Sequence, residues 1–197
     1  ISAGNSLTID VDNDVTLVGV NVDAGTDIEV DFGGDLEIAA QQDRSVTSGV
    51  GVGASVGVQV SAVPAATGPT ASVQFGASTT DSVNVTQAVF GAGGNIRIAG
   101  PGDARIAGVD VNAGGNIELD TGELTIETLS DQATTTGFGV DLRSPNQIAS
   151  GRAPIAVGRL NDSTNTIDAV AGLSAGGNLD INSTGAVTNR GGRLSAN

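Results

Sequence analysis

Short runs of alternating apolar and polar residues follow one another along this chain, separated by glycine and asparagine. These runs occupy residues 6–11, 14–18, 20–23, 27–31, 95–98, 104–107, 109–112, 116–120 and 123–127. Alternation with a period of two over three to five residues is typical of a β-strand with one buried face. No stretch combines a 3.6-residue apolar period with helix caps, so the pattern predicts many short strands and no substantial helix.

The short runs belong to a longer repeat. Residues 92–122 restate residues 3–33 with 13 of 31 positions identical, and residues 175–196 restate residues 92–113 with eight of 22 identical. Within each copy, equivalent alanines lie 21 residues apart. A period near 20 in strand-forming residues predicts stacked coils, because a single coil cannot bury its own apolar face. We therefore expect one all-β domain built as a β-solenoid.

The repeat also predicts which side chains face inward and which support the turns. Ten apolar residues at equivalent repeat positions are expected in one continuous core: Val11, Leu17, Val22, Ile28, Ile98, Ile106, Val111, Ile117, Ile181 and Leu194. Asn95, Asn116 and Asn178 each follow a Gly-Gly pair. Stacked asparagines at a turn can hydrogen-bond from coil to coil, so we expect these three to form a structural ladder.

Two stretches leave the 21-residue period, at residues 44–90 and 130–172. In the first, two alternating runs flank a segment rich in Pro and Gly, which predicts a hairpin pairing 46–61 with 71–87. Its tip is expected at 64–69. The coils are then assigned to about 1–43, 91–129 and 173–197. Because Gly49-Val50-Gly51-Val52 aligns with Gly137-Phe138-Gly139-Val140, the two departures are themselves repeats.

The composition removes several classes of chemistry. The chain has no Cys, His, Met, Trp, Tyr or Lys and only four Phe. Disulfides and thiolate metal sites are therefore excluded, and acid–base catalysis could use only carboxylates. We expect no cofactor. Because the chain lacks Met, we expect it to be a fragment of a larger protein.

The charge narrows the choice of partners. The formal net charge is −14, and residues 10–37 hold nine acidic residues and no basic one. Such a surface repels phosphate groups, which argues against nucleic acid and anionic membranes as partners. No apolar stretch reaches 18 residues, so we expect no transmembrane segment. Half of the arginines fall in the two departures: Arg44, Arg143, Arg152 and Arg159.

Three acidic motifs are candidates for a binding or catalytic site. Residues 10–14 (Asp-Val-Asp-Asn-Asp) begin like a calcium loop but lack the glycine and the bidentate glutamate that an EF-hand needs at its sixth and twelfth positions. Asp27 with Asp31, or Asp120 with Glu123, could be imagined as the paired carboxylates of a glycosidase. These acids alternate with apolar residues, as the outward face of a coil does, so we expect no catalytic residue and no metal site.

The whole pattern resembles the haemagglutinin repeats of filamentous-haemagglutinin-type exoproteins, a group that includes two-partner secretion adhesins and contact-dependent inhibition toxins. The matching segments are AGGNIRIAG (92–100), GVDVNAGGNIELDTG (108–122), SAGGNLDI (174–181), NRGGRLSA (189–196) and GVGVGASVGVQVS (49–61). The resemblance implies a right-handed parallel β-helix with extra-helical hairpins, secretion through an outer-membrane transporter, and a place at the bacterial cell surface.

The resemblance also implies a function, namely that of an extended rod that presents other regions of an adhesin or a contact-dependent inhibition protein. It fixes no active site. Two alternatives stay open: a binding module whose hairpins engage a receptor or glycan on a host or neighbouring cell, and, more remotely, a β-helix carbohydrate-active enzyme.

Overall fold

The computed structural model is an all-β structure that describes residues 1–59, 68–143, 148 and 153–197. The chain divides into two compact units. The first, here called the coil stack, comprises Ile1–Asp43, Asn84–Asp131 and Asn165–Asn197. The second comprises Arg44–Val83 and Gln132–Thr164.

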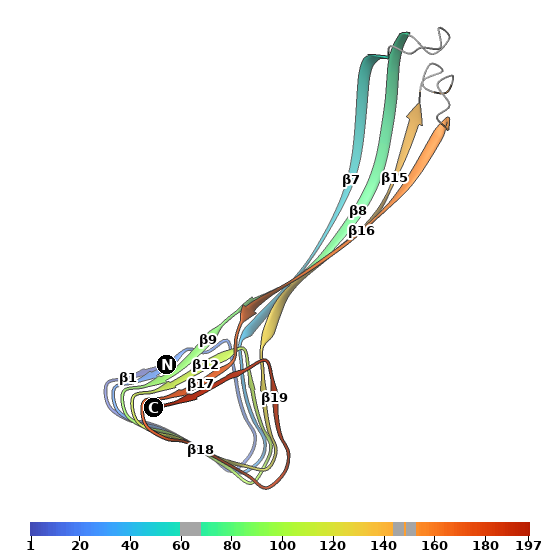
Figure 1. Ribbon diagram of the computed structural model, residues 1–197. Helices are drawn as coiled ribbons and strands as arrows, with labels where there is room; N and C mark the ends of the chain where they lie inside the picture. The colour runs from blue at the N-terminus through green and yellow to red at the C-terminus, as the bar shows by residue number, and fades with distance from the viewer. Residues whose placement is uncertain (60–67, 144–147, 149–152) are drawn as a thin grey trace. The chain divides into compact units, whose positions relative to one another are not determined.

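The coil stack is a parallel β-helix with three sides, one sheet on each side (Figure 1). Sheet A contains β1 (Ser2–Ala3), β4 (Val22–Ala24), β9 (Ala88–Ala92), β12 (Val109–Ala113), β17 (Gly172–Ala175) and β20 (Arg193–Ala196). Sheet B contains β2 (Leu7–Val11), β5 (Ile28–Phe32), β10 (Ile96–Ala99), β13 (Ile117–Thr121) and β18 (Leu179–Ser183). Sheet C contains β3 (Val15–Val18), β6 (Leu36–Ala39), β11 (Ala104–Ala107), β14 (Leu124–Glu127) and β19 (Val187–Arg190).

Equivalent residues of successive coils pair directly. Ile96 pairs with Ile28 on one side and with Ile117 on the other, and Ile117 pairs with Leu179. All of these pairings are parallel, as expected when each coil returns to the same side of the stack. The 21-residue period of the sequence is therefore the register of the stack.

Inward-facing Val, Ile, Leu and Ala side chains fill the interior. Val22, Ile28, Ile98, Val111 and Ile117 are all at most 1% exposed and belong to one core cluster. Phe32 and Phe90 are the aromatic members of this cluster. Small aliphatic side chains suffice here because three sheets enclose a narrow space, so the scarcity of aromatic residues costs the coil stack little.

Four expected core residues lie at the ends of the stack. Leu17 and Ile181 are partly buried and pack against the core, whereas Val11 is 36% and Leu194 45% exposed. The expectation was wrong for Val11 and Leu194. Both lie in the outermost strand of their sheet, where a neighbouring coil covers only one side.

The second unit is built from a four-stranded sheet, sheet D, in the order β16-β15-β8-β7. Its strands are β7 (Gln41–Gln59), β8 (Gly68–Thr86), β15 (Leu129–Arg143) and β16 (Ile155–Ala169). β8 and β15 pair antiparallel, with Phe138 opposite Ala77 and Val140 opposite Phe75. The hairpin insertions expected from the sequence are present, and the structure adds that both contribute to this one sheet.

Side-chain hydrogen bonds show the direction of β7 against β8. The hydroxyl groups of Ser48 and Thr79 are hydrogen-bonded at 3.3 Å, and those of Ser55 and Ser72 at 2.5 Å. Residue numbers therefore increase along β7 in the direction in which they decrease along β8. This antiparallel order agrees with the expected pairing of 46–61 with 71–87. The expected tip at 64–69 lies outside the described residues, apart from Gly68 and Pro69 at the start of β8.

Both hairpins are inserted at the same corner of the coil, between sheet C and sheet A. One follows β6 and the other follows β14, both in sheet C, and each returns to sheet A. Where no hairpin enters, the chain turns this corner through a glycine with positive φ: Gly19 (65°), Gly108 (63°) and Gly191 (79°). Coils with a glycine corner thus alternate with coils carrying a hairpin, which explains why the longer repeat comprises two coils.

Candidate functional site

The three predicted asparagines stack at the corner between sheets A and B. Asn116 donates its backbone N–H to Oδ1 of Asn95 at 2.8 Å, and Asn178 does the same to Oδ1 of Asn116 at 2.8 Å. The side-chain oxygens therefore satisfy turn amides that precede the next strand. The structure brings these three residues together as a coil-to-coil ladder with a supporting role.

This ladder is one residue longer than the sequence suggested. Asp27 accepts the backbone N–H of Asn95 at 2.7 Å and its side-chain amide at 3.2 Å. From the sequence, Asp27 was interpreted only as an outward-facing acid and as a possible partner of Asp31. Its position 89 residues before Asn116, the offset that relates residues 3–33 to 92–122, was the signal that could have found it.

A second ladder, made of aspartates, runs along the corner between sheets B and C. Asp14 accepts the backbone N–H of Asp35 at 2.9 Å, Asp35 accepts that of Asp103 at 3.0 Å, and Asp103 accepts that of Glu123 at 2.9 Å. Sequence reasoning missed this ladder, because Asp14 was interpreted as part of a calcium-loop-like motif and Asp35 as surface charge. They use one carboxylate oxygen each to hold the coils in register.

Two arginines bridge acidic residues of neighbouring coils. Arg97 reaches Asp31 at 2.8 Å and Glu29 at 3.1 Å, and the hydrogen bond to Asp31 raises the pKa of Arg97. Arg105 forms ion pairs with Glu37 of the preceding coil and Glu127 of the following coil. Part of the dense acidic charge is thus paired along the stack, which limits repulsion between coils.

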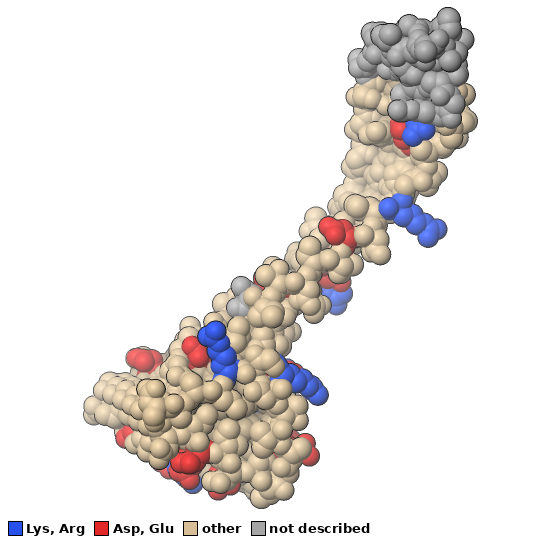
Figure 2. Space-filling model, in the orientation of Figure 1, with Lys and Arg blue, Asp and Glu red and all other residues tan. Residues whose placement is uncertain are grey.

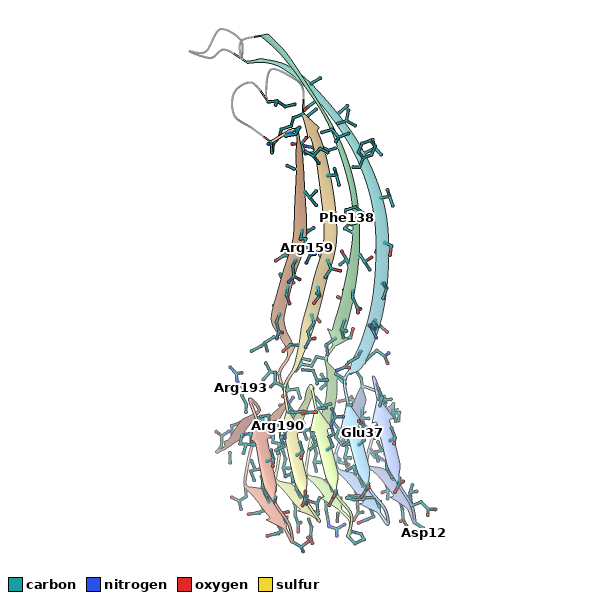
Figure 3. The ribbon with its side chains drawn as sticks, turned by 90° about the vertical axis from the view of Figure 1, so that its right-hand side faces the viewer. Asp12, Glu37, Phe138, Arg159, Arg190 and Arg193 are labelled. Atoms are coloured by element: carbon teal, nitrogen blue, oxygen red, sulfur yellow. The ribbon has the colours of Figure 1, made fainter. Side chains whose placement is uncertain are left out.

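Three of the carboxylates considered as a catalytic or calcium site, Asp14, Asp27 and Asp31, have other contacts. Asp31 is bound to Arg97, and Asp27 belongs to the ladder. Asp10 and Asp12 are exposed. Asp12 lies at the end of the stack opposite Arg190 and Arg193 (Figure 3). Among the described residues, no group of three or more acidic side chains is placed to hold a metal ion.

Sheet D presents its apolar side chains to solvent. Val50 is 86%, Val157 68% and Phe138 55% exposed. The Ser48–Thr79 bond and the pairing of Phe138 with Ala77 place Val50 and Phe138 on the same face, because side chains alternate along each strand. The backbone N–H of Arg143 donates to the carbonyl oxygen of Pro154, next to β16. This pairing of β15 with the β16 side places Val157 on the same face as Phe138. A single-layered sheet of this kind leaves an apolar face available for contact.

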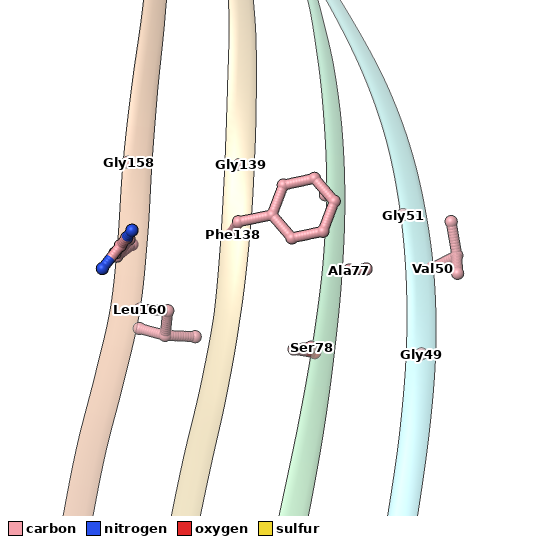
Figure 4. Close-up of a pocket in the computed structure, with 11 residues that line it drawn as sticks. Gly49, Val50, Gly51, Ala77, Ser78, Phe138, Gly139, Gly158 and Leu160 are labelled. Atoms are coloured by element: carbon pink, nitrogen blue, oxygen red, sulfur yellow. The ribbon is translucent and has the colours of Figure 1, made fainter.

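Glycines occupy the opposite face across all four strands. They are Gly49, Gly51, Gly53, Gly76, Gly137, Gly139 and Gly158. Two adjoining hollows of about 650 and 530 Å³ are lined by most of these glycines and by their neighbours. Figure 4 shows the bare ribbons at Gly49, Gly51, Gly139 and Gly158, with Phe138 extending from β15 toward β8. This part of sheet D is our candidate contact surface.

Charge is sparse in the second unit. It contains three of the 22 acidic residues and four of the eight arginines. Arg44 and Asp81 form an ion pair of 2.5 Å between β7 and β8. The hydrogen bond from Arg44 lowers the pKa of Asp81, and the same bond raises the pKa of Arg44. On the face in Figure 2, acidic side chains gather over the coil stack, and the sheet is mostly uncharged.

Comparisons with known proteins agree with this architecture. A protein-family model described as Hemagglutinin repeat matches residues 1–54 and 44–142. Searches of curated proteins and of solved structures each found no significant match. In the part of the chain that the structure describes, no helix is both long and apolar enough to cross a membrane.

Proposed function

Because the chain belongs to the Hemagglutinin repeat family, we propose that it acts as a structural segment of a secreted filamentous adhesin or contact-dependent inhibition exoprotein. Its role is to extend and to hold other regions of that protein away from the cell. The observation that carries this proposal is the continuous core of the coil stack, held in register by two side-chain ladders. Such a stack lengthens by about 4.8 Å with each added coil, at little cost in new sequence.

The family match also supports a route to the surface. We propose that the protein is exported by two-partner secretion, through an outer-membrane transporter, and that it works at the bacterial cell surface. A chain with no cysteine and a 21-residue repeat suits export in an unfolded form, because each emerging coil can pack on the one before it.

We also propose that the chain catalyses no reaction and binds no metal ion specifically. The acidic side chains are distributed over several sides and both ladders, so they attract divalent cations only diffusely. The test is thermal unfolding of the full chain with calcium, with magnesium at equal ionic strength, and with a chelator. We expect equal melting temperatures in the two salts. A calcium-selective gain of many degrees that Asp12→Asn abolishes would overturn the proposal.

A second candidate function is recognition of a receptor or glycan by sheet D. It is favoured by the exposed apolar face with Phe138 and Val50 and by the adjoining hollows. Binding of the labelled full chain to bacterial and mammalian cells distinguishes the two candidates. The recognition function requires saturable binding that falls with Phe138→Ser and survives Thr8→Ser in the coil stack. If the chain acts only as a scaffold, no saturable binding is expected.

A further inference from the structure

The two open edges of sheet D differ in how they are protected. β7 carries Asp43 and Arg44 near its start, but it has no charged residue and no proline from position 45 to 59. β16 carries Arg159 and Asp162 in its middle. Open strand edges pair readily with other strands, and natural proteins block that pairing with charges, prolines or bulges. By this criterion β16 is protected and β7 is not.

The side chains of β7 are exposed, and the outer edge of this strand is free to pair. All of its described side chains, from position 41 to 55, are exposed. Val46 is 60%, Val50 86% and Val52 71% exposed, so valines are held in solvent on a strand whose outer edge has no neighbour among the described strands. Valine is favoured in strands because it packs against cross-strand partners, and here one side offers none.

The sequence of β7 complements itself. If two copies of this strand run antiparallel about a twofold axis at Gly51, each Val50 lies opposite the partner copy's Val52 and each Gly49 opposite its Gly53. In the same register Ser48 faces Ala54 and Thr47 faces Ser55. None of the residues paired between positions 47 and 55 is charged, so no charge lies opposite another charge in this stretch.

We propose that β7 pairs antiparallel with β7 of a second copy of this chain, centred on Gly51. The two sheets then form one eight-stranded sheet. Its apolar face and its opposite, glycine-bearing face both continue across the junction. Backbone hydrogen bonds supply the attraction, as in other strand additions, and the valine pairs fix the register. The expected assembly is a symmetric dimer, because the contact uses the same strand on both copies.

The test is the mass of the full chain in solution, measured by sedimentation velocity and light scattering over a wide concentration range. We expect the mass to rise from 19.2 kDa toward twice that value with concentration. The double substitution Val50→Lys with Val52→Lys places like charges directly opposite each other, so the dimer should weaken by about tenfold or more. Its far-UV circular dichroism should match that of the unmodified chain, because both valines are exposed.

Two further variants keep the proposal falsifiable. Val157→Lys changes a valine of similar exposure on the same face of β16, the other edge, and should leave dimerisation unchanged. Val50→Lys with Val52→Glu places opposite charges across the junction only in the proposed register, so it should restore the dimer. The proposal is overturned by a chain that stays monomeric, by a double-lysine variant that still dimerises normally, or by equal weakening with Val157→Lys.

Discussion

The coil stack and sheet D are both built from strands of alternating sequence, but apolar residues are buried in the first and exposed in the second. In the coil stack three parallel sheets enclose the inward-facing residues, and Ile117 and Ile98 are fully buried. In sheet D the same alternation leaves Val50 and Phe138 mostly in solvent. Alternation by itself therefore predicts a strand with two different faces, but not that the apolar face is covered.

Glycine also has a different role in each region. Gly108 in the coil stack has positive φ, and a Cβ there would lie 3.0–3.2 Å from atoms of Ala40, Ala169 and Leu129. At Gly49, Gly51 and Gly158 in sheet D, a Cβ would meet nothing within 4 Å, and φ is ordinary. The stack requires glycine for its own geometry, whereas much of sheet D does not.

The largest contrast should come from introducing one charge into each region. Ile117→Asp buries a carboxylate in the apolar core cluster, on the strand between β10 and β18, so it should lower the free energy of unfolding by about 3–5 kcal/mol. Val157→Asp on sheet D should change it by less than about 0.5 kcal/mol. Urea unfolding followed by circular dichroism measures both. Similar losses at the two sites would mean that sheet D is covered in solution.

The roles of glycine predict changes of opposite sign. Gly108→Ala should destabilise the chain by about 1–2 kcal/mol, because alanine is strained at positive φ and its Cβ crowds three neighbours. Gly158→Ala should stabilise it by about 0.4–1 kcal/mol, because alanine restricts the unfolded chain and meets open space in the folded one. Thermal melts of the two variants give the comparison. Destabilisation by Gly158→Ala would show that something approaches the glycine face closely.

A smaller effect is expected at the asparagine ladder. Asn116→Ala removes the acceptor for the backbone N–H of Asn178 and should cost about 0.5–1.5 kcal/mol. Asn116→Asp keeps an acceptor oxygen at the position, as Asp27 does naturally, and should cost less than the alanine variant. Amide hydrogen exchange at Asn178 should rise in the alanine variant alone. Equal exchange in both variants would show that the ladder does not protect this amide.

The smallest effect concerns the Arg44–Asp81 pair of sheet D. The hydrogen bond from Arg44 lowers the pKa of Asp81 below the ordinary aspartate value of 3.8, so the pair stabilises the folded chain above that pH. This contribution is lost as the pH falls through the lower, folded-state pKa. A carbon-detected NMR titration should show Asp81 titrating at a lower pH than in Arg44→Gln. Identical titration midpoints would mean that the exposed pair is not formed in solution.

The sequence by itself determined the coil architecture of this protein. Its 21-residue period is the register of the stack, and the Gly-Gly-Asn positions lie on one corner, because equivalent residues of a solenoid must contact each other. Residues such as Val22, Ile28 and Val111 could be placed in the core from the repeat alone. The two departures could be recognised as hairpins from their alternation around turn residues.

Only the tertiary structure decided what the repeat does not encode. Both hairpins join one sheet through the pairing of β8 with β15, two strands that lie far apart in sequence and do not occupy equivalent positions of the repeat. The aspartates of the second ladder share the repeat offsets, since Asp14 lies 21 residues before Asp35 and 89 before Asp103, but only the structure shows that their carboxylates accept backbone N–H groups of the next coil. Val11 and Leu194 are exposed for a related reason. Burial of a coil residue requires a neighbouring coil that covers it, and the identity of the residue alone does not show whether that coil is present.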